Sequence, residues 1–276
     1  MLNLNKAALT FLSIFILFQT LGFSQSLKEA ILQNSITISS HRGVSVLGEE
    51  ENSILSMTKA LTEGILLHEI DIMESKDGKL YLLHDETLDR TTDKKGKIIE
   101  TDSDILDSAH LNGTKEPLPT FKEALYWAKE NGAYLMLDVK SAPVAKVMAE
   151  VEELELMDRV MLLTFSRERT KEAISYPKSF LISALIQDKS DIDYFSDLFT
   201  GSDFLIGYIN KSADTYLYQE VKSAGIPIIT DTMGELDKQA HQGDGNTYID
   251  FINSKNPDIL VSDYPLLLKK VVNKHF

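Results

Sequence analysis

The feature that most constrains the fold of this chain is a regular alternation of short β-rich runs and amphipathic helical segments. Several of the runs are apolar at consecutive positions, which indicates strands that are covered on both faces. Strands of that kind, separated by helices, are typical of a parallel sheet with helices packed outside it. The eight runs are residues 36–40, 65–72, 133–139, 160–165, 179–186, 204–209, 226–230 and 258–262. Helical patterns between them include residues 53–63, 120–131, 142–156, 213–224 and a stretch near 234–254.

The number of strands predicts the architecture. Eight parallel strands alternating with helices within about 250 residues are the pattern of a TIM-type (β/α)8 barrel, an α/β fold. A doubly wound open sheet is the alternative, but no strand is followed by the Gly-x-Gly-x-x-Gly pattern that would favour it. The chain has no internal repeat, low-complexity tract or linker that would divide it. We therefore expect residues 25–276 to form a single barrel domain.

A ninth β-rich run, residues 80–84, does not fit the alternation. Too few residues separate it from the preceding strand for a parallel crossover, which needs about a dozen, so the two must form an antiparallel hairpin. Lys76-Asp77-Gly78 is the expected turn, and the register that follows places His84 opposite Asp71. The second barrel strand would therefore extend beyond the barrel and return His84 to its rim. A small insertion, at about residues 86–118, follows the hairpin.

The first 24 residues have the pattern of a secretory signal peptide. Lys6 supplies the basic start, residues 7–18 are a short apolar run, and residues 22–24 place small side chains where a signal peptidase cleaves. A retained membrane anchor is the alternative, but the polar pair Gln19-Thr20 ends the run before it could span a bilayer comfortably. We therefore expect an exported protein, periplasmic or secreted, without a stable membrane anchor.

Composition excludes several classes of partner and chemistry. The chain has 28 Lys and Arg against 42 Asp and Glu, a formal net charge of −14, which argues against nucleic acid and against an anionic membrane surface. Cysteine is absent, so disulfides, thiolate nucleophiles, sulfur-ligated zinc and cysteine-linked lipids are excluded. The oligomeric state cannot be inferred from these features.

Polar residues that could carry chemistry collect at the carboxyl ends of the predicted strands, where TIM-type barrels build their active sites. Glu69 and Asp71 are two residues apart and lie on one face of their strand, as do Asp138 and Lys140. The residues at these ends are His41, Arg42, Glu69, Asp71, His84, Asp85, Asp138, Lys140, Asn210, Asp231 and Asp263.

Three carboxylates, Glu69, Asp71 and Asp138, converge at one rim of the predicted barrel. Their mutual repulsion must either raise their pKa values or require a cation. An all-oxygen set suits Mg²⁺ or Ca²⁺. The alternative is a structural network in which these acids pair with Arg42, Lys140 and other bases.

Short motifs follow one another at characteristic intervals along the chain. They are His41-Arg42-Gly43, Glu51-Asn52-Ser53, Glu69-Ile70-Asp71, Ser75-Lys76-Asp77-Gly78, Leu83-His84-Asp85, Leu88-Asp89-Arg90-Thr91-Thr92, Pro119-Thr120, Leu137-Asp138-Val139-Lys140 and Ser262-Asp263-Tyr264-Pro265. This ordered set resembles the glycerophosphodiester phosphodiesterase family over about residues 36–265. The resemblance implies a TIM-type barrel with a small insertion after the hairpin. It also implies cleavage of glycerol phosphodiesters with a divalent cation held by carboxylates.

The resemblance also implies roles for individual residues. His41 and His84 match the histidine pair that acts as acid and base, and Glu69 and Asp71 match the first two metal ligands. Asp138 stands where the family usually has Glu, which shortens that side chain by one methylene and could shift the cation or its preference.

A second departure concerns the late strand motif, usually aromatic-Thr-hydrophobic-Asn, which reads Ile229-Thr230-Asp231 here. The substrate fit at that side of the barrel is therefore open. Tyr208, nearby, could pack in the barrel or line the pocket. His68 alternates with Glu69, so we expect it to face the helices in a structural role.

The chemistry follows from the charge of a phosphodiester, which repels nucleophiles. A cation, Arg42 and Lys140 would neutralise that charge and stabilise the transition state. One histidine must take a proton from the nucleophile, either water or a neighbouring hydroxyl, and the other must donate one to the departing alkoxide. Attack by a substrate hydroxyl would form a cyclic phosphate first.

Three functions fit these observations. The first is metal-dependent hydrolysis of a small-molecule glycerophosphodiester to an alcohol and glycerol phosphate. The second is release of a phospholipid or sphingolipid headgroup with formation of a cyclic phosphate, which the polar insertion disfavours. The third is a non-catalytic barrel that binds phosphate esters, which the intact set of histidines and carboxylates disfavours.

Overall fold

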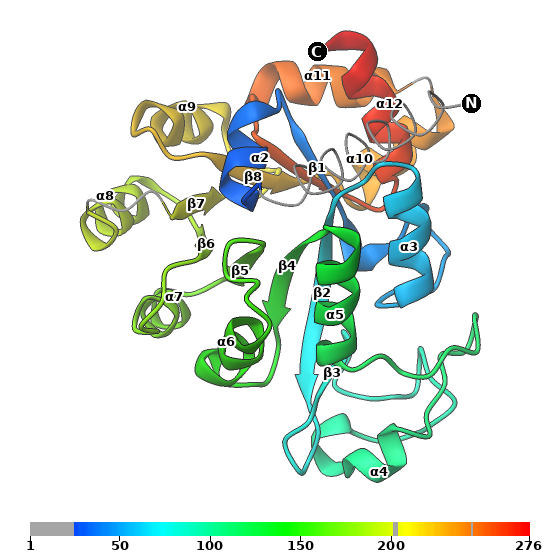
Figure 1. Ribbon diagram of the computed structural model, residues 1–276. Helices are drawn as coiled ribbons and strands as arrows, with labels where there is room; N and C mark the ends of the chain where they lie inside the picture. The colour runs from blue at the N-terminus through cyan, green and yellow to red at the C-terminus, as the bar shows by residue number, and fades with distance from the viewer. Residues whose placement is uncertain (1–24, 201–203, 244) are drawn as a thin grey trace, which may run out of the picture.

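A computed structural model describes residues 25–200, 204–243 and 245–276 (Figure 1). The predicted signal peptide, residues 1–24, lies outside the described residues. Nine strands form one sheet in the order β1-β9-β8-β7-β6-β5-β4-β2-β3, and β1 also pairs with β2. Eight parallel strands therefore close into a barrel, which confirms the predicted fold. They are β1 (Thr37–Ser40), β2 (Leu67–Glu74), β4 (Tyr134–Val139), β5 (Val160–Thr164), β6 (Leu181–Leu185), β7 (Leu205–Tyr208), β8 (Ile228–Asp231) and β9 (Ile259–Ser262), and β3 (Leu80–Leu82) is the additional strand.

Helices surround the barrel and connect its strands (Figure 1). The stretch predicted near residues 234–254 forms two helices, because Gly243 caps the first and Gly245, at φ 82°, precedes the second. Helices not singled out from the sequence are α2, α4, α7, α8 and α12. The bounds are α2 (Leu27–Gln33), α3 (Ile54–Thr62), α4 (Ser103–Leu106), α5 (Phe121–Asn131), α6 (Val144–Glu153), α7 (Arg167–Ile174), α8 (Lys189–Leu198), α9 (Thr215–Ser223), α10 (Glu235–Gln242), α11 (Asn246–Lys255) and α12 (Pro265–His275).

The barrel has an apolar interior that α2 closes from one end. Inward side chains from seven strands pack together with Leu27, Ala30 and Ile31 of α2. The helix begins at a Ser26 capping box, and the Leu27 N–H donates to the carbonyl of Asp158 at 2.8 Å. The inward side chains are Leu67, Tyr134, Met136, Met161, Leu163, Leu181, Ile206, Ile229, Ile259 and Val261.

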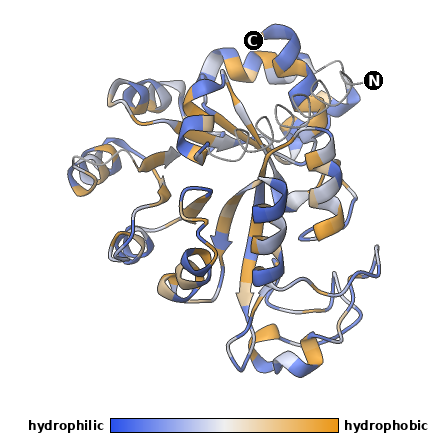
Figure 2. Ribbon diagram, in the orientation of Figure 1, coloured by the Kyte–Doolittle hydropathy of each residue, from blue (hydrophilic) through white to orange (hydrophobic). Residues whose placement is uncertain are grey.

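A second apolar layer lies between the strands and the outer helices. Ile70, Ile72 and Leu137 belong to it, so alternate residues of one strand contribute to the two layers. Figure 2 shows the strands in hydrophobic colours and the surrounding helices in mixed ones. In the described part of the chain, no helix is both long and apolar enough to cross a membrane.

The hairpin forms as predicted, but its register differs from the prediction by one residue. Leu83, not His84, donates its N–H to the carbonyl of Asp71, at 3.1 Å. The prediction placed the centre of the turn between Asp77 and Gly78. The turn is Lys76-Asp77-Gly78, as expected, but it is centred on Asp77, with Gly78 in the left-handed region at φ 92°. His84 consequently lies beyond the paired part of β3.

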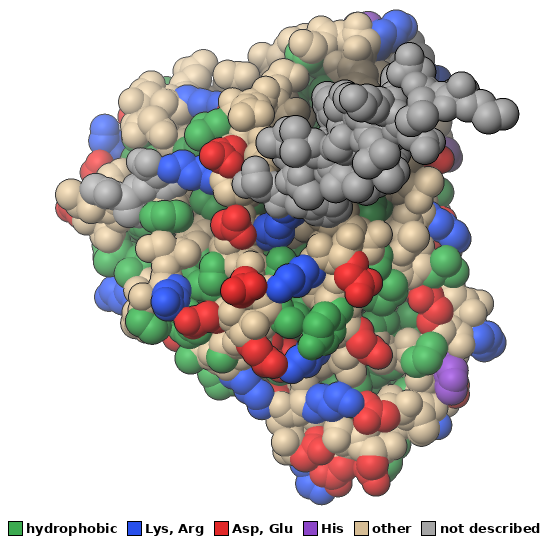
Figure 3. Space-filling model, viewed as in Figure 1, with side chains coloured by type: hydrophobic (Ala, Val, Ile, Leu, Met, Phe, Trp, Pro, Cys, Tyr) green, Lys and Arg blue, Asp and Glu red, His purple; other side chains and the backbone are tan. Residues whose placement is uncertain are grey.

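The insertion between β3 and α5 has a small core of its own. It contains η2 (Ile98–Glu100) and α4, and residues such as Leu88, Ile98 and Leu106 pack against Tyr81 of the hairpin. Among the described residues, acidic and basic side chains are interspersed on the face seen in Figure 3, and acidic ones gather over α4. The insertion is therefore a folded unit seated on β2 and β3, beside the barrel rim.

Candidate active site

The inner face of the barrel changes from apolar to polar towards the carboxyl ends of the strands. On β2 the inward positions are Leu67, then Glu69 and Asp71, and on β4 Met136 is followed by Asp138. The same alternation places an inward-facing polar or aromatic residue towards the carboxyl end of seven strands, or directly after that end. The residues that conclude these inner columns are His41 after β1, Asp71 on β2, Asp138 on β4, Phe165 after β5, Tyr208 on β7, Asp231 on β8 and Asp263 after β9.

Glu69, Asp71 and Asp138 form a compact carboxylate cluster. One oxygen of each lies within 4.8 Å of those of the other two, and the strand register pairs Asp71 directly with Asp138. Burial, together with the charge of Asp71, raises the pKa of Glu69 well above its ordinary value. Burial also raises the pKa of Asp138. Three acidic oxygens at this spacing could hold one divalent cation, whose charge would offset their repulsion.

Lys140 lies against two of these carboxylates. Its Nζ is 2.5 Å from Asp138 Oδ2 and 3.1 Å from Asp71 Oδ1. Burial opposes the charge of Lys140, but Asp71 and Asp138 outweigh it and raise the pKa of the lysine. Two of the three carboxylates, Asp71 and Asp138, therefore pair with a base, as the alternative of a structural network predicted. Glu69, however, accepts from the backbone nitrogen of Arg42 at 2.8 Å rather than from a cationic side chain.

The His41-Arg42-Gly43 motif forms a tight turn, η1 (His41–Gly43), directly after β1. Arg42 adopts φ 50°, ψ 28°, the left-handed region that costs a non-glycine residue on the order of 1 kcal/mol. This conformation points the Arg42 N–H at Glu69. Gly43, at φ 73°, packs so closely on Met57 that a Cβ there would overlap it, which explains the glycine in the motif.

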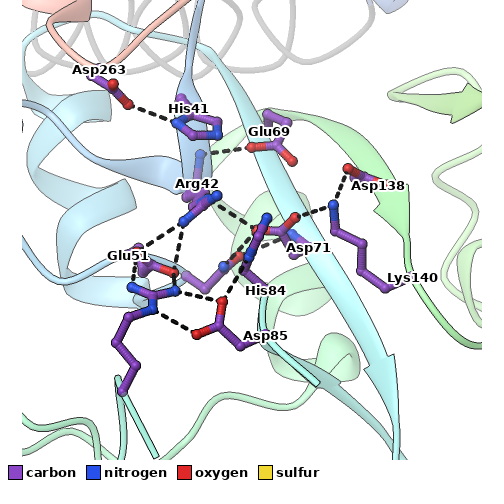
Figure 4. Close-up of polar contacts among 12 residues, drawn as sticks. His41, Arg42, Glu51, Glu69, Asp71, His84, Asp85, Asp138, Lys140 and Asp263 are labelled. Carbon is purple, nitrogen blue, oxygen red and sulfur yellow. Dashed lines mark hydrogen bonds and ion pairs between the residues drawn. The ribbon is translucent and has the colours of Figure 1, made fainter. Parts of the chain in front are cut away.

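His41 is oriented by a carboxylate from the last barrel strand. Its Nδ1 is 2.7 Å from Asp263 Oδ1, as Figure 4 shows. Burial disfavours the charged imidazole, but the hydrogen bond to Asp263 and the negative charge of Glu69 outweigh burial and raise the pKa of His41. Because a carboxylate only accepts, Nδ1 carries the proton and Nε2 is left for substrate.

The Arg42 guanidinium lies between two acidic side chains. Its Nη1 donates to both oxygens of Glu51 at 3.1 Å, and its Nε is 3.6 Å from Asp71 Oδ2. Arg42 Nε is buried and makes no hydrogen bond within the described residues. A buried donor without a partner is costly, so this atom could receive an anionic oxygen of a ligand.

His84 is tied to the same arginine through a chain of ion pairs (Figure 4). His84 Nδ1 lies 2.8 Å from Asp85 Oδ1, and Asp85 accepts from Arg90 Nε and Nη2 at 2.6 and 2.9 Å. Arg90 also donates to both oxygens of Glu51, at 2.8 and 2.6 Å, and Glu51 accepts from Arg42. Arg90 holds the pKa of Asp85 well below its ordinary value.

The opposite side of the rim, at the ends of β5, β7 and β8, is aromatic and internally paired. Phe165 is 45 % exposed and contacts Tyr208 edge-on, with ring centroids 5.4 Å apart. The Tyr208 hydroxyl donates to Asp231 Oδ2 at 2.8 Å, and Lys211 is ion-paired with the same carboxylate. We call Phe165, Tyr208, Lys211 and Asp231 the aromatic half of the rim. We call the rim residues at the ends of β9, β1, β2 and β4 the charged half, namely Asp263, His41, Glu69, Asp71 and Asp138.

A cavity of about 390 Å³ lies between the ends of β4 and β5, where the two halves adjoin. Asp138 and Lys140 line it on one side and Phe165 and Arg169 on the other. Larger cavities occur elsewhere, but they lie between outer helices or beside α2, away from the carboxylate cluster. The cavity beside Asp138 is therefore the one next to the candidate chemistry.

The predicted site residues occupy one end of the barrel. Glu69, Asp71 and Asp138 come together as expected, with Arg42 and Lys140 in contact with Asp71. His41 approaches through η1 and His84 through the ion-pair chain. His68 is buried against Trp127, with ring centroids 5.2 Å apart, in the structural role expected of it.

Several residues of the motifs support the site although the sequence alone predicts no role for them. The Asn52 side chain donates to Asp71 Oδ2 at 2.9 Å and accepts from the Asp71 backbone at 3.0 Å. Asp85, Arg90 and Asp263 hold the two histidines, directly or through a partner. Their presence in the motifs was the available signal, but pairing between distant segments is visible only once the chain is folded.

Comparison with protein families identifies a match over most of the chain. The model of the glycerophosphoryl diester phosphodiesterase family matches residues 41–241. A glycerophosphodiester phosphodiesterase of Caldanaerobacter subterraneus is 28 % identical over 159 residues, which are 53 % of this chain and 65 % of that relative. The chain thus spans less than two thirds of that relative.

Solved structures share the fold over most of their length. A glycerophosphoryl diester phosphodiesterase from Parabacteroides distasonis superposes with a TM-score of 0.80 at 22 % identity, covering 91 % of this chain and 92 % of that one. An Oleispira antarctica phosphodiesterase, solved with the product sn-glycerol-3-phosphate, gives a TM-score of 0.71 at 22 % identity, covering 86 % and 96 %.

Proposed function

Because this chain belongs to the glycerophosphoryl diester phosphodiesterase family, we propose that it hydrolyses glycerophosphodiesters to an alcohol and glycerol phosphate, using a divalent cation. One observation carries the proposal. Three carboxylates within 4.8 Å of one another adjoin Arg42, Lys140 and His41 at the carboxyl end of a TIM-type barrel.

The donor set fits the cation that such a reaction needs. Glu69, Asp71 and Asp138 offer oxygen ligands, which Mg²⁺ and Ca²⁺ prefer. When bound, the cation would polarise the phosphate and offset the charge that develops in the transition state. Asp138 approaches from β4 in register with Asp71, so an aspartate at this position still reaches the cluster although the family usually has Glu there.

The remaining side chains are assigned to the phosphate and to proton transfer. The Nε of Arg42, which makes no hydrogen bond within the described residues, and the Nζ of Lys140 would bind phosphate oxygens beside the cluster. His41 and His84 carry out the two proton transfers: one takes a proton from the nucleophile, either water or a neighbouring hydroxyl of the substrate, and the other protonates the departing alkoxide. Attack by the hydroxyl would form a cyclic phosphate, which water then opens to glycerol phosphate. Each has Nδ1 occupied by an aspartate, so Nε2 is the atom that exchanges protons with the substrate.

The alcohol of the substrate is assigned to the aromatic half of the rim. Phe165, a member of that half, lines the same cavity as Asp138 of the carboxylate cluster. The similar Oleispira antarctica phosphodiesterase was solved with the product sn-glycerol-3-phosphate, which supports a glycerol phosphate as the shared part of the substrate. The proposal also includes export, to the periplasm or beyond, on the pattern of residues 1–24.

An assay with defined substrates tests the proposal. The purified protein would be incubated with glycerophosphocholine, glycerophosphoethanolamine and glycerophosphoinositol, with and without chelator. We expect metal-dependent release of alcohol and glycerol phosphate from at least one. Turnover of phospholipid alone, with a cyclic phosphate product, would replace the proposal with the headgroup-releasing activity. Binding without turnover of any substrate would contradict it.

A further inference from the structure

The insertion supplies an arginine that contacts two site motifs at once. Arg90 lies between β3 and α5, far in sequence from Glu51 and directly after the His84-Asp85 motif. Its guanidinium donates four hydrogen bonds of 2.6–2.9 Å, two to Glu51 and two to Asp85. The planar fork of an arginine can hold two carboxylates in fixed orientations, which the single ammonium of a lysine cannot do.

Each of these carboxylates in turn holds a residue of the proposed chemistry. Asp85 is bonded to His84 Nδ1 at 2.8 Å, and Glu51 accepts from Arg42 Nη1 through both oxygens. One unbroken series of contacts therefore runs from Arg42 through Glu51, Arg90 and Asp85 to His84. Figure 4 labels Arg42, Glu51, Asp85 and His84 of this series.

We propose that Arg90 is a positioning residue that sets the orientation of His84 and of Arg42 together, through Asp85 and Glu51. The inference rests on the proposed function. It assigns the insertion a part in the reaction: seating the insertion on the rim delivers the guanidinium that aligns a proton-transfer group with a phosphate-binding group.

The charges along this series favour orientation rather than stability as its purpose. Arg90 is 47 % exposed, and exposed ion pairs contribute little to folding. Burial alone would raise the pKa of Glu51, but Arg90 and Arg42 outweigh burial and lower it. Both carboxylates thus remain ionised acceptors, and Asp85 keeps the proton of neutral His84 on Nδ1.

Imidazole ¹⁵N spectra test the inference without reference to activity. In the wild-type protein we expect neutral His84 to be protonated on Nδ1. Arg90→Gln frees Asp85 to rotate, so the population with the proton on Nε2 should grow, as it should in Asp85→Asn. Lys97→Gln is the matched control, because Lys97 is a basic residue of the insertion that pairs with Glu100 instead. An unchanged His84 tautomer in Arg90→Gln would overturn the inference.

Kinetic constants separate the two arms of the series. Asp85→Asn should lower kcat, because His84 transfers a proton, whereas Glu51→Gln should chiefly raise KM, because Arg42 binds phosphate. Arg90→Gln should do both, by about 10- to 100-fold in kcat/KM, and Arg90→Lys should not restore them. Added to the Glu51→Gln/Asp85→Asn double variant, Arg90→Gln should have little further effect.

The outcomes distinguish this inference from the proposed function. Wild-type protein that turns over no glycerophosphodiester contradicts the proposed function, and the positioning role in catalysis with it, while the tautomer measurement still tests the contact series. If the wild-type protein is active and the kcat and KM of Arg90→Gln are within twofold of the wild-type values, the positioning role alone is overturned. Circular dichroism and thermal melting establish that each variant is folded.

Discussion

The charged half and the aromatic half of the rim are built by the same barrel but differ in what their side chains leave available. In the charged half, three carboxylates crowd together, and the buried Nε of Arg42 makes no hydrogen bond within the described residues. In the aromatic half, Asp231 is satisfied by Tyr208 and Lys211. The crowded carboxylates mark the side where a cation and a phosphate can bind. The acid of the aromatic half is already paired, so that half offers a fixed surface against which an alcohol can fit.

The largest expected effect concerns the cation of the charged half. Dialysis against chelator should remove activity by on the order of 10²-fold or more, and Mg²⁺ or Ca²⁺ should restore it. The measurement is steady-state turnover of a glycerophosphodiester before and after metal is returned. Full activity in metal-free buffer would mean that the three carboxylates serve structure alone.

The histidines should separate the two halves most clearly. His41→Ala and His84→Ala should each reduce kcat by about 10²–10⁴-fold with the fold retained, because each removes one proton transfer. Tyr208→Phe, which changes a rim residue of the aromatic half, should leave kcat nearly unchanged. Either alanine variant with near wild-type kcat and unchanged thermal stability would rule out that histidine as acid or base.

Asp138 lies where the two halves meet, so its substitution should affect the cation more than the fold. Asp138→Asn should weaken metal affinity sharply, because an amide carries no charge, and Asp138→Glu should be tolerated or change the preferred metal. Calorimetric titration of Mg²⁺ and Ca²⁺ into both variants is the measurement. An unchanged dissociation constant in the asparagine variant would leave Glu69 and Asp71 as a two-carboxylate site.

Removing the charge of Asp231 should alter the aromatic half alone. Asp231→Asn removes the charge that pairs with Lys211 and should change KM by up to about tenfold, differently for different alcohols, with kcat little affected. Comparing glycerophosphocholine with glycerophosphoinositol would reveal the change. An equal loss of kcat on both substrates would place Asp231 in the chemistry instead.

The smallest effect is on stability and arises behind the charged half. Burial lowers the pKa of His68 to about 3, so the folded protein does not bind the proton that the unfolded chain accepts near pH 6.5. Stability should therefore fall as pH falls below about 6.5, by about 2 kcal/mol at pH 5. Urea unfolding of wild type and His68→Leu at pH 7.5 and 5 isolates this contribution. Parallel pH dependences of the two proteins would contradict it.

The sequence was sufficient to predict the barrel and the carboxylate cluster because both depend on local rules. Strand alternation places Glu69 and Asp71 on one inward face, and a parallel register brings Asp138 to the same height. The hairpin register was wrong by one residue, because the prediction centred the turn between Asp77 and Gly78, whereas the pairing of the strands centres Lys76-Asp77-Gly78 on Asp77.

What the sequence could not show is which distant residues orient the histidines. The contact of His41 with Asp263 joins the first and last strands, and it follows from barrel closure rather than from spacing. Likewise, the ion pairs of Arg90 depend on how the insertion folds back onto the rim. Residue roles that arise from packing between remote segments need the assembled structure.

Helix α2 sets a limit on how far the amino terminus can be shortened. Its Leu27 and Ile31 fill the end of the barrel, and its Ser26 cap lies two residues beyond the predicted cleavage point after residue 24. A processed chain starting at residue 25 keeps α2 intact. A recombinant chain starting near residue 35 would lack α2 and would expose the apolar end of the barrel interior to water. A chain that begins at residue 25 therefore retains the whole of α2 and its Ser26 cap, whereas removal of α2 should destabilise the barrel.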